Sequence, residues 1–398
     1  MKDDSAPKTR LSVVVGAGDP DAGRAPTDLA SVADLLRRQP NGQPWLRFAD
    51  KSYTAAEVCR IASDLAAHLA RCGVVRGGHV GLLMSNRPEF IFWWLAINDV
   101  GATAVFLPTV FLEQGLARYQ AYIVPEVIVC ERHLGVEAKL DLSVAIPIQD
   151  DILLLPRADD PATPSAPDDL PSPSPADASC IVFTSGSSGL PKAVVFSHRY
   201  VLELGHHIAY GKGMQPGEKL YFSNPLFHGD GIIAVVTTLA LRGELHLAER
   251  FSVTRFWDDV ARFGSTIFYY VGASLSFLAR SPEPTATPSH RLRFATGGGA
   301  TEAVADMFEQ RFGIPVLDAY SQTECLACCS NTLAVRKRGT VGKPYAGIEV
   351  RIVDDLEQPV PLGATGNIVV RPPRPYMTFS FYLNDPSATV QKTRNLLH

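Results

Sequence analysis

The spacing of hydrophobic residues in the first third of the chain alternates between helical and strand-like periods. Val58, Ile61, Leu65 and Leu69 recur every three or four residues, which predicts a helix from Thr54 to Cys72. Short apolar runs and a second helix that opens at Pro88 follow it. These predicted elements are the strands Val80–Met84, Ala104–Leu107 and Val124–Cys130 and the helix Pro88–Val100.

The same alternation resumes after residue 178. Predicted strands are Cys180–Phe183, Lys219–Phe222, Thr266–Tyr270, Arg293–Thr296 and Pro315–Asp318. Predicted helices are Val201–Tyr210, Gly231–Leu241, Val253–Phe263 and Glu302–Phe312. Strands that alternate with helices indicate βαβ units and a parallel sheet, so the fold class is α/β. A length of 398 residues favours two or three packed units.

Composition along the chain sets the expected boundaries. Residues 1–25 are polar and rich in Gly, Asp and Pro, and we expect a flexible tail there. Residues 26–338 form the predicted α/β core, interrupted at 156–177 by a proline-rich linker or excursion. Strand-like runs at Val350–Val353 and Asn367–Arg371 predict a small β-rich subdomain over 339–398.

The overall charge and hydropathy narrow the class of partner. The chain is 46% hydrophobic with a formal net charge of -4, which gives no electrostatic footprint for nucleic acid or an anionic membrane. No apolar run is long enough to span a bilayer, and no signal peptide follows the acidic start at Asp3 and Asp4. We therefore expect a cytoplasmic protein with a small-molecule substrate, and the oligomeric state stays open.

Cysteine usage favours reduced thiols, because seven scattered cysteines do not suit a disulfide framework. The run Cys325-Leu-Ala-Cys328-Cys329 raises the possibility of a metal site. A closed zinc site needs four ligands, and no second Cys or His pair stands at a suitable spacing. We expect these cysteines to be small buried residues on a helix.

The most informative segment is a Ser- and Gly-rich loop that directly follows a predicted buried strand. Its residues are Thr184, Ser185, Gly186, Ser187, Ser188 and Gly189, followed by Pro191 and Lys192. Glycines let backbone N–H groups turn toward an anion, hydroxyls add donors, and the lysine adds positive charge. The loop is suited to holding a polyphosphate, although its spacing is not that of a Walker A loop.

This loop resembles the phosphate-binding loop of adenylate-forming enzymes, the family of acyl-CoA synthetases, luciferases and peptide-synthetase adenylation domains. It departs at Ser188, where Thr is usual, and at Ala193, where Gly is usual; both residues are small. The resemblance implies an N-terminal large domain built from two packed βαβ-type subdomains and a small β-rich one. It also implies ATP or AMP, Mg²⁺ and coenzyme A as ligands.

Further blocks of that family follow in order. Gly297-Gly298-Gly299-Ala300 is similar to the segment that lines the adenine site. Tyr320-Ser321-Gln322-Thr323-Glu324 resembles the family's Tyr-x-x-Thr-Glu block. By this resemblance Tyr320 packs on the adenine, Thr323 bonds phosphate and Glu324 binds Mg²⁺, which prefers carboxylate and phosphate oxygen.

The resemblance also places a substrate pocket. Phe227 and His228 stand in the block beside the acyl pocket, and Val271 and Gly272 would line its opposite wall. His228 occupies the position where amino-acid-activating relatives carry an Asp, so an aliphatic or aryl acid is favoured. A packed or capping histidine is the alternative, and for Asp230 we expect a solvated carboxylate. The predicted catalytic residues are Lys192, His228, Thr323 and Glu324.

Late blocks extend the resemblance over roughly residues 30–390. They are Gly339-Thr-Val-Gly342-Lys-Pro344, Gly363-Ala-Thr-Gly366-Asn-Ile and Tyr382-Leu-Asn384-Asp-Pro386. The family continues with a Thr-Gly-Asp block and a C-terminal domain that carries a catalytic lysine, and we expect this chain to lack both. The implied activity is ATP-dependent conversion of a carboxylic acid to acyl-AMP, then to a CoA thioester. The alternatives are acyl transfer to a carrier-protein thiol and a truncated nucleotide- or acyl-binding protein without turnover.

Overall fold

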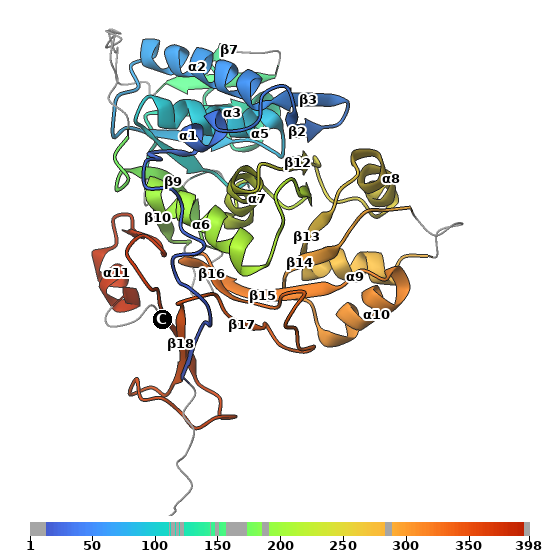
Figure 1. The fold of residues 1–398 in the computed structure, drawn as a ribbon. Helices are drawn as coiled ribbons and strands as arrows, with labels where there is room; N and C mark the ends of the chain where they lie inside the picture. The colour runs from blue at the N-terminus through green and yellow to red at the C-terminus, as the bar shows by residue number, and fades with distance from the viewer. Residues whose placement is uncertain are drawn as a thin grey trace, which may run out of the picture.

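The computed structural model describes residues 13–393 except 111, 113–115, 117–118, 120–122, 144, 148–150, 157–172, 185–190 and 283–288. In these residues the strands form three sheets, and helices cover the two large ones (Figure 1). The expected α/β class is confirmed. Most of the proline-rich stretch predicted at 156–177 lies outside the described residues.

The first large sheet has the strand order β20-β10-β9-β5-β4-β6-β8-β7. Its centre, from β9 to β6, is parallel, and antiparallel strands flank it on both sides. The strands are β4 (His79–Leu83), β5 (Thr103–Phe106), β6 (Val127–Glu131), β7 (Ile146–Pro147), β8 (Ile152–Pro156), β9 (Ala178–Phe183), β10 (Ala193–Ser197) and β20 (Phe381–Tyr382). The helices of this region are α1 (Val32–Arg37), α2 (Ala55–Arg71), α3 (Pro88–Asp99) and α5 (Arg132–Glu137).

The second large sheet has the order β17-β16-β15-β14-β13-β11-β12-β2-β3 and is parallel from β15 to β2. Its strands are β2 (Pro44–Phe48), β3 (Lys51–Thr54), β11 (Lys219–Phe222), β12 (Glu244–Leu247), β13 (Ile267–Val271), β14 (Phe294–Gly298), β15 (Val316–Gln322), β16 (Cys325–Ser330) and β17 (Lys343–Pro344). The associated helices are α6 (His198–Gly211), α7 (Gly229–Ala240), α8 (Val253–Phe263), α9 (Gly272–Arg280) and α10 (Glu302–Phe312).

The third sheet is small and antiparallel, and in Figure 1 it extends away from the other two. It consists of β1 (Val13–Val15), β18 (Glu349–Val353) and β19 (Asn367–Arg371). Part of the segment expected to be a tail is therefore paired, because β1 bonds along β18. Ala25 is buried, and its carbonyl accepts a bond from Arg199 at 2.6 Å. Residues 1–12 lie outside the described part.

Local sequence explains the boundaries of the predicted helices. Helix α2 starts after a capping box, in which the Thr54 hydroxyl accepts from the Glu57 N–H at 3.2 Å and the Glu57 carboxylate accepts from the Thr54 N–H at 2.8 Å. Helices α8 and α10 end at Gly264 and Gly313, both at positive φ. Glycine adopts this conformation without a Cβ clash, and this ends each helix at the predicted residue.

The cysteine-rich run differs from its prediction. Cys325–Ser330 is strand β16 and not a helix, and each of its six residues is buried. A strand buried on both faces shows no polar alternation, so its short apolar run cannot be told from a buried helix by periodicity. The described residues contain no group of three or more His, Cys, Asp or Glu side chains that could hold a metal.

Candidate active site

Strands β9 and β10 hold the base of the predicted phosphate loop. The Thr184 N–H donates to the Lys192 carbonyl at 3.0 Å, and the Lys192 N–H donates to the Thr184 hydroxyl at 3.1 Å. These bonds pair Thr184 with Lys192, the residues that follow β9 and precede β10. The predicted loop residues Ser185, Gly186, Ser187, Ser188 and Gly189 lie outside the described residues.

Lys192 and Glu324 both contact Tyr382. The Lys192 ammonium lies 4.8 Å from the centre of the Tyr382 ring, and the Tyr382 hydroxyl donates to the Glu324 carboxylate. Glu324 is buried in the two-residue turn between β15 and β16, where Thr323 precedes it half-buried. Burial and the Glu324 carboxylate together raise the pKa of Tyr382, which keeps its phenol protonated. The fold thus joins two predicted site residues through a tyrosine that the site prediction omitted.

A second lysine approaches this cluster from helix α11 (Pro386–Thr393). The Lys392 ammonium donates to the Gln322 side-chain oxygen at 2.9 Å. Burial lowers the pKa of Lys392, Glu324 opposes that effect, and the positive charge of Lys192 adds to it. The turn at Glu324 is therefore flanked by two cationic side chains. Lys392 lies in no recognisable motif, so only the three-dimensional structure places it here.

The predicted adenine segment lies at the carboxyl end of β14. An added Cβ at Gly272 would lie 2.0 Å from the Gly299 carbonyl oxygen, so glycine allows these two backbones to touch. Gly299 has φ of +83°, and the following Ala300 N–H donates to the Asp318 carboxylate at 3.3 Å. Ligands of α/β sheets bind at this carboxyl edge of the strands.

A cavity of about 150 Å³ opens beside this segment. The predicted residues Val271, Gly298 and Tyr320 line it, together with groups that the site prediction missed. The full lining is Ile208, Lys212, Asp230, Ile233, Tyr269, Val271, Gly297, Gly298, Ala319, Tyr320, Ser321, Leu326, Cys329 and Tyr345. Tyr320 and Ser321 belong to β15, and Glu324 lies in the turn that ends this strand, so β15 connects the cavity wall to the Lys192–Tyr382–Glu324 cluster.

Asp230 lines the cavity, whereas the predicted pocket residue His228 does not. Its carboxylate accepts from the Tyr269 hydroxyl at 3.0 Å and from the Asn224 amide at 3.3 Å, so it is not the solvated group that we expected. Burial raises the pKa of Asp230. His228 is exposed at the start of α7, with its ring 4.6 Å from that of the buried Phe227.

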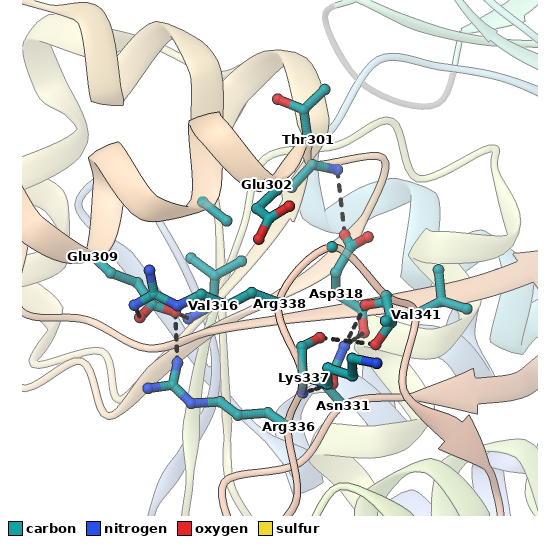
Figure 2. Close-up of a pocket in the computed structure, with 14 residues that line it drawn as sticks. Thr301, Glu302, Glu309, Val316, Asp318, Asn331, Arg336, Lys337, Arg338 and Val341 are labelled. Carbon is teal, nitrogen blue, oxygen red and sulfur yellow. Dashed lines mark hydrogen bonds and ion pairs between the residues drawn. The ribbon is translucent and has the colours of Figure 1, made fainter.

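A larger cavity of about 620 Å³ lies between the start of α10 and residues 336–341 (Figure 2). Three of its charged side chains are paired with one another, since Glu309 accepts from Arg336 at 2.5 Å and from Arg338 at 2.9 Å. Lys192 and Glu324 line neither cavity, and Tyr320 lines only the smaller one. The larger cavity shares Ala300 with the predicted adenine segment, whereas Gly298 of that segment lines the smaller one.

The geometry defines a class of protein: an α/β domain in which a lysine and a buried carboxylate contact one tyrosine, and a small cavity lies at the carboxyl edge of the second sheet. The family model "AMP-binding enzyme" matches residues 32–383. The chain belongs to this family, as the sequence motifs had indicated.

Similar proteins carry names from lipid metabolism and acid activation. A long-chain fatty acid transport protein 1 of Mus musculus is 30% identical over 322 residues, which cover 75% of this chain and 49% of that protein. A medium/long-chain-fatty-acid–CoA ligase of Mycobacterium tuberculosis is 29% identical over 83% of this chain and 56% of its own length. The chain therefore spans about half the length of these curated relatives.

Solved structures share the fold. ATP-bound MatB from Rhodopseudomonas palustris has a TM-score of 0.80 at 22% identity and covers 92% of this chain, which covers 75% of it. A benzoate CoA ligase from Burkholderia xenovorans LB400 has a TM-score of 0.77 at 20% identity, with the same coverage of each chain. Within the described residues, no helix combines the length and hydrophobicity needed to cross a bilayer.

Proposed function

We propose that this chain binds ATP and a carboxylic acid and activates the acid as acyl-AMP. The observation that carries the proposal is the meeting of Lys192, Tyr382 and Glu324 at the turn that ends β15, the strand whose Tyr320 and Ser321 line the cavity. Membership of the AMP-binding family supports it, as do relatives named as fatty-acid–CoA ligases. The loop, the adenine segment and the cavity then serve phosphate, base and acid.

In the proposed reaction, an oxygen of the ionised acid attacks the α-phosphorus of ATP. A new carboxylate O–P bond forms, the bond from the α-phosphorus to the bridging oxygen breaks, and pyrophosphate leaves with that electron pair. The acid needs no base, because it is already ionised at neutral pH. Lys192 would stabilise the negative charge on the phosphates, and Thr323 would donate to a phosphate oxygen.

The donor set fits one Mg²⁺ ion held jointly by protein and nucleotide. Mg²⁺ is commonly bound through one or two carboxylates plus substrate phosphates, and Glu324 supplies one buried carboxylate. The ion would neutralise phosphate charge as pyrophosphate departs. The Tyr382 hydroxyl, which donates to Glu324, would hold this carboxylate in place.

Coenzyme A is the proposed acceptor in the whole protein, because relatives are named as CoA ligases. A carrier-protein thiol is the alternative acceptor, and binding without turnover is the alternative to catalysis. We infer a cytoplasmic setting from the sequence alone. The comparison of coenzyme A with a pantetheinylated carrier protein needs the whole protein, whereas the adenylation step can be assayed with this chain.

Acid-dependent exchange of pyrophosphate into ATP tests the proposal directly. We expect slow exchange that requires a carboxylic acid and Mg²⁺, and that falls in Lys192→Met and Glu324→Gln. Lys51→Met, at an exposed position of β3, is the matched lysine control. Binding of ATP without any exchange would favour the binding protein, and the absence of ATP binding would refute the proposed site.

A further inference from the structure

Lys212, the residue that follows α6, is a buried lysine at the candidate acyl cavity. Lys212 is only 4% exposed. The ammonium donates to the Thr296 hydroxyl at 2.8 Å and to the Ser330 hydroxyl at 2.6 Å. Both partners are neutral, no carboxylate of the described residues lies within ion-pair distance of the ammonium, and Asp318 acts on its charge only from farther away. A buried positive charge without a directly paired counter-ion is costly.

The two hydroxyls have further partners of their own. Thr296 donates to the Leu317 carbonyl at 3.1 Å, and Ser330 donates to the Asn331 carbonyl at 2.8 Å. Each hydroxyl can therefore offer Lys212 only a lone pair. An ammonium has three N–H donors, and these contacts use two of them. One donor thus remains for a ligand in the cavity that Lys212 lines.

Exposure differs along the cavity wall, and Lys212 belongs to its buried part. Val271 and Ser321 are exposed, whereas Ile208 and Tyr345 are 2% and 5% exposed. An acid whose carboxylate faces the phosphates would point its other end toward Lys212. The volume of about 150 Å³ lies below the range of about 300–1,000 Å³ that is common for small-molecule pockets.

We infer that the acid activated at this site is a short dicarboxylic acid, whose second carboxylate pairs with the Lys212 ammonium. This inference rests on the proposed function and names the substrate class for it. The second carboxylate supplies the missing counter-ion, and the remaining N–H of Lys212 supplies its hydrogen bond. Asp230 lines the same cavity but is already bonded to Tyr269 and Asn224.

A long apolar chain fits this cavity poorly for two reasons. It would need far more room than about 150 Å³, and it would place methylene groups against a buried ammonium. The relatives named for medium- and long-chain acids therefore do not fix the substrate of this chain. Lys212 is a specificity-determining residue in this account, because it contacts the distal end of the substrate and not the reacting atoms.

Succinate and 4-methylpentanoate provide a matched pair of probes. Each carries five non-hydrogen atoms beyond one carboxylate, and they differ in a terminal carboxylate against a branched alkyl end. We expect calorimetry on the full chain with Mg-ATP to show binding of succinate that is tighter by on the order of tenfold or more. Lys212→Met should reverse this preference, whereas the exposed control Lys51→Met should preserve it.

A separate titration with Mg-ATP alone distinguishes a failure of the dicarboxylate inference from a failure of the proposed function. If ATP binds while the two acids bind equally, or while succinate does not bind, the dicarboxylate inference is overturned and the proposed function stands. The inference also falls if Lys212→Met weakens both acids equally, since that result indicates a structural role. If ATP does not bind, the proposed function itself is refuted.

Discussion

Replacing Lys212 with methionine should raise the free energy of unfolding of the ligand-free protein at neutral pH. This gain should disappear at high pH. Burial lowers the pKa of Lys212 from 10.5 to about 7, although Asp318 opposes the effect. Between these values the unfolded state binds more protons, so the stability of the wild type rises with pH. Below about pH 7 Lys212 is charged in both the folded and the unfolded state, so the full free-energy cost of burying its charge is present.

The expected magnitude follows from this shift. A difference of about 3.5 pKa units corresponds to a destabilisation of roughly 5 kcal/mol below pH 7. Methionine removes that cost but also loses hydrogen bonds to Thr296 and Ser330, worth about 1 kcal/mol each. The hydroxyls keep their carbonyl acceptors, so no donor is left unsatisfied. We expect a net gain of about 3 kcal/mol at pH 6.5, as an order of magnitude.

Urea denaturation of wild type and Lys212→Met at pH 6.5 and 9.5 measures the difference. The gain should shrink by about 3 kcal/mol between the two pH values, because the wild-type lysine becomes neutral. The other titratable groups that line the cavity are present in both proteins and largely cancel in the comparison, as does Asp318, whose charge interacts with Lys212. The groups that line the cavity are Asp230, Tyr269, Tyr320, Cys329 and Tyr345. A pH-independent difference between the two proteins would refute the reasoning.

Other substitutions test the site and the fold separately. Glu324→Gln keeps a partner for the tyrosine hydroxyl but removes the charge, so Mg-ATP should bind about tenfold more weakly by calorimetry; unchanged Mg²⁺ dependence would remove the metal assignment. Lys192→Met should weaken ATP more than adenosine in the same assay, and equal losses would argue against a phosphate contact. Gly272→Ala should lower stability by about 1–3 kcal/mol in urea, because its Cβ would meet a backbone carbonyl; a neutral result would contradict the close approach. Thr54→Ala should cost about 1 kcal/mol through the lost cap without changing ATP affinity, and weaker ATP binding would contradict the separation of cap and site.

Elements with complete local signals could be predicted from the sequence. Helices α8 and α10 and strand β11 have the predicted bounds, because each helix combines an apolar face with a terminal glycine. Strand β10 was missed, although Ala193–Ser197 is fully buried. It forms the far arm of a hairpin whose loop dominates the local sequence, and its apolar run is too short to show a period.

The candidate site residues likewise fall into those with a local sequence signal and those without one. Lys192, Tyr320 and Glu324 stand in compact motifs whose composition reports their chemistry. Lys212 and Asp230 do not, because a lysine after a helix and an acid at a helix start are ordinary surface residues in most sequences. Their burial follows from strands β13, β14 and β16 packing around them, and no local pattern encodes that packing.

The block around Tyr382 lies beyond the predicted boundary at residue 339 but contributes a residue to the candidate site. The Phe379 N–H donates to the Glu324 carbonyl at 2.9 Å, and the Leu383 N–H donates to the Ala193 carbonyl at 2.8 Å. The segment between them runs from the Glu324 turn of the second sheet to the first sheet, where β20 pairs with β10. Tyr382 can contact Lys192 and Glu324 only because this segment bridges the two sheets. A chain cut at residue 338 would keep both motifs and lose the contact that brings them together.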